Sequence, residues 1–214
     1  STLMSVLFGL YQPEAGEIKK DGKVVKINDP NDATALGIGM VHQHFKLVEC
    51  FSVLDNIIAA MNSTMKYGFL TSILRLPAYW KEEKAAKEKA YELLSIFNME
   101  DVAEEKAGSL PYGAQRRVEI LRALATNPKL LLLDEPAAGM NPAETEELME
   151  NIRKIRDTFH IAILLIEHDM SLVMGVCDGI CVLNFGKVIA KGTPDEIKND
   201  PTVIEAYLGK HDDE

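Results

Sequence analysis

Residues 130–136 read LLLLDEP, four leucines that lead into two adjacent acids, Asp134 and Glu135. A short apolar run of this kind is typical of a strand buried in a parallel sheet whose two faces are covered by helices. Open α/β sheets bind their ligands at the carboxyl ends of the strands. One carboxylate there could hold a metal through water while the other deprotonates an attacking water, although the pair could instead cap the next helix.

Two further apolar runs also end in polar side chains. GMVHQ ends at Gln43, and IAILLIEHD runs into Glu167, His168 and Asp169. The amide could ligate Mg²⁺ or position a water, and the imidazole could donate to a phosphate oxygen whose charge grows during a reaction. Either residue could instead simply end its strand. A chance origin is less plausible for three strand ends with complementary polar side chains than for one. The three together therefore favour a functional site.

The second half of the chain alternates between strand and helix patterns. We expect strands at 130–134, 161–167, 179–184 and 187–191, with helices at 142–158 and 169–176. Strands separated by helices of this length predict βαβ crossovers and a mostly parallel sheet, which is an α/β fold. Two short helices should follow, because Thr193 and Asp200 each precede a proline at a first helical position.

The first half adds an antiparallel part and a helical segment. Residues 12–27 predict a hairpin that turns at Asp21-Gly22, and residues 3–11 predict a buried helix because apolar side chains occur nearly all round. Pro77 precedes WKEEKAAKEKAYELLSIF, the clearest amphipathic stretch. A second helix follows with Val118, Leu121, Leu124 and Ala125 on one face. We therefore expect one domain, 1–214, in which a helical subdomain, 53–126, is inserted into an α/β core, 1–52 and 127–214.

Composition restricts the class of protein. The 33 acidic against 23 basic residues give a net charge of −10, which argues against nucleic-acid binding through clustered Lys and Arg. The three scattered cysteines, Cys50, Cys177 and Cys181, suit a reduced cytosolic protein. Neither a signal peptide nor an apolar run of about 20 residues is visible, so we expect no membrane-spanning helix. His42 and His44 could form a metal pair, but a strand end explains them.

The order of these features resembles the ATP-binding subunit of ABC transporters over essentially the whole chain. The order runs from a Ser-Thr helix start through Gln43, a Tyr-Gly-x-Gln turn and Asp134-Glu135 to His168. The resemblance implies an ABC-type P-loop NTPase fold that binds ATP and Mg²⁺. In this family the Walker A motif, G-x-x-x-x-G-K-[ST], precedes the first helix. Ser1 matches its Mg²⁺-ligating hydroxyl and Thr2 the next residue, so we expect the chain to be cut inside the phosphate loop.

The resemblance implies a role for each strand-end residue. Gln43 matches the Q-loop glutamine, which senses the nucleotide metal and faces the membrane partner. Asp134 matches the Walker B aspartate, which holds Mg²⁺ through water, and Glu135 matches the general base. His168 matches the H-loop histidine at the γ-phosphate. Residues 137–141, AAGMN, stand in the place of the D-loop, where Asn141 replaces the usual Asp but keeps a capping side chain.

The signature motif departs from its usual form, L-S-G-G-Q. It reads Leu110 to Ala114, LPYGA, and Gln115 follows. The family implies that Pro111, Tyr112, Gly113, Ala114 and Gln115 face the nucleotide of the opposite subunit. Pro111 replaces the Ser whose hydroxyl would reach the γ-phosphate, which leaves Gly113 and the helix N-terminus as donors. Either backbone donors suffice, or the composite site is weakened; an ordinary Pro-Gly helix entry is a further alternative.

Two branches of the family are represented. Residues 7–57 resemble the ATPases of simple-sugar or nucleoside importers, whereas the chain from about residue 60 onward resembles branched-chain amino acid importer ATPases. The longer match favours the second. The implied partners are a second ATPase subunit, in a homo- or heterodimer, and membrane permease subunits on the cytoplasmic face. An extracytoplasmic substrate-binding protein is an indirect partner.

Two rivals to an importer ATPase remain. A catalytically silent fragment stays open because the phosphate loop is not in the sequence. A soluble ABC ATPase of DNA repair or translation would need long insertions or a tandem domain, neither of which is visible.

Overall fold

The computed structural model of the protein describes residues 2–43, 47–61 and 77–208. The chain divides into two compact units. The first comprises residues 1–138 and 155–166, and the second comprises residues 139–154 and 167–214.

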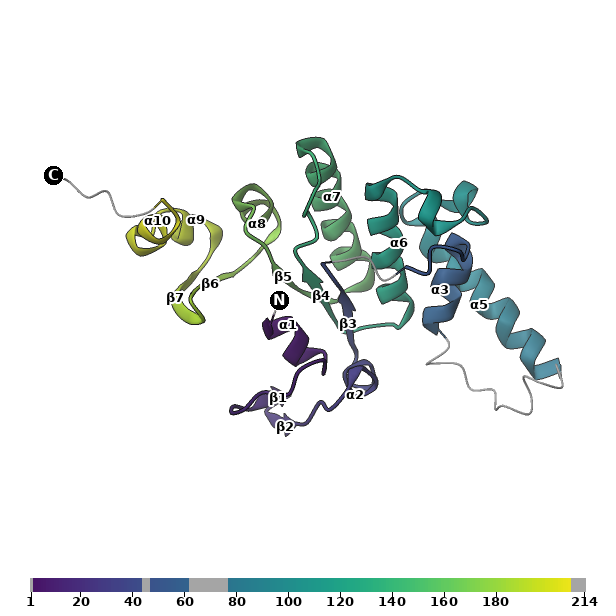
Figure 1. Ribbon diagram of the computed structural model, residues 1–214, viewed down its shortest axis with the longest axis horizontal. Helices are drawn as coiled ribbons and strands as arrows, with labels where there is room; N and C mark the ends of the chain where they lie inside the picture. Colours follow the sequence, from purple (N-terminus) through teal and green to yellow (C-terminus); the bar gives the residue numbers. More distant parts are fainter. Residues whose placement is uncertain (1, 44–46, 62–76, 209–214) are drawn as a thin grey trace. The chain divides into compact units, whose positions relative to one another are not determined.

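A parallel three-stranded sheet lies at the centre of the first unit (Figure 1). Its strands are β3 (Ile38–Val41), β4 (Leu130–Asp134) and β5 (Ala162–Ile166), with β4 in the middle. Val41 pairs with Leu133, and Asp134 pairs with Ile166. Leu131, Leu132 and Leu133 have no exposed surface, because β4 has a paired strand on each side. Helices combined with this parallel sheet and with separate antiparallel strand pairs confirm the expected α/β class.

The two outer strands are less buried than their apolar sequences predict. Burial alternates along β3, and β5 is half-buried with Ala162 exposed. Within the described residues β5 pairs with β4 alone, so β5 has a neighbouring strand on one side, whereas β4 has one on each side. The expectation that all three strands are buried was wrong for β5.

The N-terminal segment combines a short helix with a two-stranded hairpin. The helix is α1 (Thr2–Leu7), and the strands are β1 (Ile18–Lys20) and β2 (Lys23–Val25). The hairpin turns at Asp21 and Gly22, whose φ angles of 51° and 76° suit a tight turn of this kind, as expected. The helix differs from the buried helix expected over 3–11, because Met4 is its only buried residue and Leu10 and Tyr11 are exposed.

Gly9 explains why α1 is short. Its φ of 77° lies in the left-handed region, which terminates a helix and favours glycine. The N–H groups of Leu10 and Tyr11 both donate to the carbonyl of Ser5, so the chain folds back on the last turn. The helix α2 (Pro30–Ala35) then begins at Asp29, whose side chain accepts from the N–H groups of Asn31 and Asp32.

The helical part of the first unit consists of three helices that pack on one another (Figure 1). They are α3 (Val53–Met61), α5 (Pro77–Ser95) and α6 (Tyr112–Ala125), with short 3-10 turns at Glu100–Val102 and Ala107–Ser109. The side chains expected on one face of α6 are all buried. Because α6 also packs beside β3, it joins the helices to the sheet.

Asn56 attaches the segment before α3 to that helix. The side chain is 1% exposed. Its Oδ1 accepts from the N–H of Val48 at 2.9 Å, and its Nδ2 donates to the carbonyls of Val48 and Ser52 at 3.0 Å. A buried amide with this many partners is well satisfied and holds the segment in one conformation.

The second unit contains a two-stranded antiparallel sheet and short helices. Helix α7 (Pro142–Phe159) contributes its residues up to Lys154 to this unit. The remaining elements are α8 (Met170–Val176), β6 (Ile180–Asn184), β7 (Lys187–Gly192), α9 (Pro194–Lys198) and α10 (Pro201–Leu208). Thr193 forms a capping box with Glu196, and Asp200 accepts from the N–H groups of Thr202 and Val203, which confirms both expected caps.

Asp169 is the N-cap of α8. Its Oδ1 accepts from the Ser171 hydroxyl at 2.7 Å, the Ser171 N–H at 2.8 Å and the Leu172 N–H at 3.4 Å. The bond from the Ser171 hydroxyl, with help from the two backbone donors and the nearby His168, lowers the pKa of Asp169 from its ordinary value of 3.8. Partial burial opposes this shift. The cap is therefore strongest while the carboxylate is ionised.

All three cysteines are free thiols. Within the residues that the structure describes, the helices are too short or too polar to cross a membrane.

Gly9→Ala should destabilise the protein more than Gly22→Ala. Both residues have a φ near 77°, but a Cβ at Gly9 would lie 2.6 Å from the carbonyl carbon of Asp29, whereas a Cβ at Gly22 would meet nothing within 4 Å. Left-handed strain alone is worth about 1–2 kcal/mol, and the clash should add about 1–3 kcal/mol at Gly9. Urea unfolding of the two variants measures the difference, and equal losses of stability would contradict it.

Asp169→Ala should destabilise the protein by about 0.5–2 kcal/mol at neutral pH through loss of the α8 cap. Because the folded state lowers the pKa of Asp169, this stabilisation is present above the unfolded-state pKa and is lost as pH falls through the folded one. The stability gap between wild type and Asp169→Ala should therefore narrow below about pH 4. Chemical denaturation at several pH values measures the gap. Asp169→Asn is the control, since its amide oxygen remains an acceptor and does not titrate.

Candidate functional site

The two acids predicted for the site lie where β4 ends. Asp134 is the last residue of the strand and is 4% exposed, and Glu135 is half-buried. The N–H of Glu135 donates to the carbonyl of Ile166 at 2.9 Å, so the backbone stays attached to β5 while it turns. The φ of Glu135 is 45°. A left-handed residue with a side chain costs about 1–2 kcal/mol, and such strain is concentrated at functional sites.

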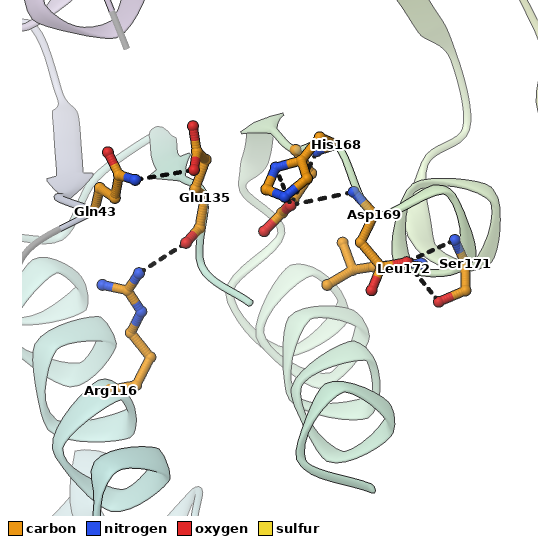
Figure 2. Close-up of polar contacts among 8 residues, drawn as sticks. Gln43, Arg116, Glu135, His168, Asp169, Ser171 and Leu172 are labelled. Carbon is orange, nitrogen blue, oxygen red and sulfur yellow. Dashed lines mark hydrogen bonds and ion pairs between the residues drawn. The ribbon is translucent and has the colours of Figure 1, made fainter. Parts of the chain in front are cut away.

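Gln43 contacts Glu135 directly (Figure 2). The parallel register pairs Val41 with Leu133, so the residue two positions after Val41 lies level with Glu135. The Nε2 of Gln43 donates to Oε2 of Glu135 at 2.9 Å. Three predicted residues, Gln43, Asp134 and Glu135, are thus brought together at one end of the sheet.

The donor set at this end of the sheet fits Mg²⁺ bound together with a nucleotide. Among the described residues, no three His, Cys, Asp or Glu side chains are grouped so that they could hold a metal by themselves. Mg²⁺ is usually held by one or two protein oxygens, with waters and substrate phosphates as the other ligands. The carboxylate of Asp134 and the amide oxygen of Gln43 are ligands of this type. The amide nitrogen of Gln43 is directed to Glu135 and the oxygen is directed away from it (Figure 2).

Of the two residues predicted to lie at the phosphates from the start of the sequence, the structure describes Thr2. Thr2 is exposed at the first position of the helix. Ser1 lies outside the described residues.

The residues that resemble a signature motif form the entry to α6. Pro111 is the N-cap and provides no side-chain hydrogen bond, so the backbone N–H groups of the first turn are the donors at this helix end. The hydroxyl of Tyr112 donates to the carbonyl of Ala138 at 2.6 Å, and Nε2 of Gln115 donates to the carbonyl of Leu110 at 2.8 Å. The helix entry is therefore fixed to the segment after β4.

In the second unit, His168 follows β5. Its side chain is 77% exposed, whereas that of Glu167 is 1% exposed. Oε2 of Glu167 accepts from the N–H groups of His168 and Asp169 at 3.0 and 3.4 Å, and lies 3.6 Å from Nδ1 of His168 (Figure 2). Glu167 and the α8 cap thus fix the backbone at His168 while its imidazole faces outward.

Asn141 caps α7, as its side chain suggested. Its Oδ1 accepts from the N–H groups of Ala143 and Glu144 at 3.0 and 3.1 Å. The carboxylate of Glu144 accepts from the N–H of Asn141 at 2.9 Å, which completes a reciprocal cap.

Arg116 contacts the same loops, although the motif pattern assigned it no role. The side chain is 1% exposed and forms an ion pair of 2.9 Å with Glu119. Its guanidinium donates to the carbonyls of His42, Glu135 and Pro136. Opposite charges three residues apart in a helix expected to be buried are a sequence signal that could have found the pair.

Family models match most of the chain. A model described as "ABC transporter" matches residues 1–138, and a model described as "Branched-chain amino acid ATP-binding cassette transporter" matches residues 187–213.

Curated relatives are similar over nearly the full chain. The high-affinity branched-chain amino acid transport ATP-binding protein BraF of Pseudomonas aeruginosa is 39% identical over 210 residues, which cover 98% of this chain and 82% of BraF. The protein LivG of Salmonella typhimurium, with the same description, is 40% identical with the same coverage. The guanosine import ATP-binding protein NupO of Bacillus subtilis is 40% identical over 189 residues, which cover 88% of this chain and 34% of NupO.

Solved structures have the same fold. The ADP conformation of MJ1267, an ATP-binding cassette of an ABC transporter, matches with a TM-score of 0.80 at 30% identity, over 98% of this chain and 83% of MJ1267. The ADP- and phosphate-bound dimeric cassette MJ0796 matches with a TM-score of 0.72 at 23% identity, which shows the fold alone. The family models and these relatives show that the chain belongs to the family of ATP-binding subunits of ABC transporters.

Proposed function

We propose that this chain is the ATP-hydrolysing subunit of an importer for branched-chain amino acids. The observation that carries the proposal is the convergence of Asp134, Glu135 and Gln43 at the carboxyl end of β4. The substrate class is supported by the names of BraF and LivG and by the family model at residues 187–213.

Each strand-end residue has a separate task in this proposal. Glu135 deprotonates the attacking water, and Gln43 orients the Glu135 carboxylate through its amide N–H. Asp134, Gln43 and Ser1 would hold Mg²⁺, which when bound would neutralise charge on the nucleotide phosphates. Thr2 would lie beside the phosphates, and the exposed imidazole of His168 would donate to the γ-phosphate.

The signature residues would serve the nucleotide of a second ATPase subunit. Pro111, Tyr112, Gly113, Ala114 and Gln115 surround the N-terminus of α6, a helix end whose backbone donors attract anions. The dimeric form of MJ0796 is consistent with such pairing within this fold. Whether the partner is a second copy or a different chain, the backbone N–H groups would replace the hydroxyl that Pro111 lacks.

The chain would act at the cytoplasmic face of a membrane. Within the domain 1–214, the helical subdomain, 53–126, would transmit nucleotide-driven movement to permease subunits, and an extracytoplasmic binding protein would deliver the amino acid. The packing of α3, α5 and α6 on one another supports treating these helices as one body.

Import of a nucleoside is the second candidate, because NupO has the same percentage identity as LivG, although over 189 rather than 210 residues. Deletion of this subunit in its host should abolish energy-dependent uptake of radiolabelled leucine, isoleucine and valine and leave guanosine uptake unchanged. The reverse pattern would favour the nucleoside importer.

Glu135→Gln should reduce ATP hydrolysis by the full-length protein about 10²- to 10⁴-fold, the usual contribution of a general base. Binding of a fluorescent ATP analogue should remain close to the wild-type value, because the amide has the size of the carboxylate. Phosphate release and fluorescence titration measure the two quantities.

Glu88→Gln is the matched control for this variant. Glu88 is 66% exposed on α5 and forms a loose ion pair of 3.8 Å with Lys84, so the same chemical change there should leave hydrolysis unaltered. Hydrolysis by Glu135→Gln at the rate of Glu88→Gln would exclude Glu135 as the base.

A further inference from the structure

We propose that Arg116, with Glu119 as its counter-charge, is a positioning residue that sets how Gln43 and Glu135 face each other. The inference rests on the proposed function, because it assumes that Glu135 is the base of ATP hydrolysis. Arg116 would act through the backbone of the two loops that carry these side chains, and would not touch the nucleotide itself.

The guanidinium contacts the backbone on both sides of the Gln43–Glu135 hydrogen bond. Its Nη1 donates to the carbonyl of His42, the residue directly before Gln43. Its Nη2 donates to the carbonyl of Glu135 at 3.0 Å (Figure 2), and its Nε donates to that of Pro136 at 3.2 Å. One rigid planar group thus joins the loop after β3 to the loop after β4.

The side chain at position 116 must be an arginine for this arrangement. Arginine presents five N–H donors in a fixed plane, whereas lysine presents three donors at a single point. The three carbonyls and the Glu119 carboxylate are reached from three different nitrogens. A lysine ammonium could not reach all of them at once.

Glu119 makes the burial of this charge possible. The Arg116 and Glu119 side chains are 1% and 5% exposed, and Nη1 of Arg116 lies 2.9 Å from Oε2 of Glu119. A buried charge without a partner is strongly unfavourable, so the two residues need each other. Burial lowers the pKa of the nearby Arg122, and the attraction of the Glu119 carboxylate partly opposes that shift.

The conformation of Glu135 explains why a fixed backbone matters for catalysis. Its φ of 45° is a strained state that persists only where surrounding contacts impose it. Two of the Arg116 hydrogen bonds hold the peptide units directly after this residue. Without them the turn can relax and move the carboxylate, and a displacement of about 1 Å can reduce a rate about 10²-fold.

The experiment compares Arg116→Gln and Arg116→Lys with wild type in the full-length protein, with kcat and KM for MgATP measured by phosphate release. Both variants should lower kcat about 10- to 100-fold, while KM changes less than about threefold, since Arg116 acts on the position of the base. In a Glu135→Gln background, Arg116→Gln should have no further effect on the residual rate. Arg116→Gln/Glu119→Gln, which removes both charges, tests the same point if Arg116→Gln alone does not fold.

Leu94→Ala is the control for a loss of stability alone. Leu94 is fully buried in α5, and its truncation should lower the melting temperature without lowering kcat. If Arg116→Gln lowers only the melting temperature, or raises KM at constant kcat, the positioning role is overturned while the proposed function stands. If the wild-type protein itself does not hydrolyse ATP, the proposed function fails and this inference with it.

Discussion

Parallel pairing of β4 with a strand on each side is the constraint from which the site follows. Pairing of Val41 with Leu133 and of Asp134 with Ile166 determines which residues lie level beyond the ends of the strands. A shift of one residue between β3 and β4 would turn the side chains of one strand to the other face and separate Gln43 from Glu135. Burial alternates along β3, and Val41 is 2% exposed, so a one-residue shift of that strand would turn Val41 toward the more exposed face.

The buried ion pair of Arg116 and Glu119 is better understood as a source of specificity than of stability. Desolvation of two charges offsets much of their attraction, and apolar residues of similar size often stabilise a core as well or better. Apolar residues could not donate to the carbonyls of His42, Glu135 and Pro136, which lie beyond the ends of β3 and β4. The pair therefore selects one arrangement of the two loops.

Local patterns predicted much of the fold because their causes are local. The four leucines before Asp134, the Asp21-Gly22 turn and the caps at Thr193 and Asp200 each depend on a few adjacent residues, and the structure has all of them. The burial of α1 and β5 was predicted wrongly, because burial depends on which elements cover a surface. Gly9 ends α1 early, and β5 is paired on one side, with β4, among the described strands.

The candidate site likewise contains residues that the sequence could predict and contacts that it could not. Gln43, Asp134 and Glu135 could be found from strand ends, since parallel strands bring their carboxyl ends to one edge. The contacts of Arg116 could not be predicted in this way. They join residues 74 and 19 positions apart, and their acceptors are backbone carbonyls, which every residue has whatever its side chain. The same limit applies to the bond from the Tyr112 hydroxyl to the carbonyl of Ala138.

These long-range contacts of Tyr112 and Arg116 together connect the N-terminus of α6 to Glu135, the proposed base. Tyr112 and Arg116 lie one turn apart on α6, and they hold the segment after β4 at Ala138 and at Glu135 and Pro136. A displacement of the N-terminus of α6 would therefore reach the backbone of Glu135 through the hydrogen bonds of the Arg116 side chain. If the N-terminus of α6 binds a nucleotide held by a second subunit, as proposed, binding of that nucleotide would affect the position of Glu135 in this subunit. Pro111 at the N-cap of α6 would strengthen this link. Because its φ angle is fixed, the start of the helix is less free to move relative to the segment after β4.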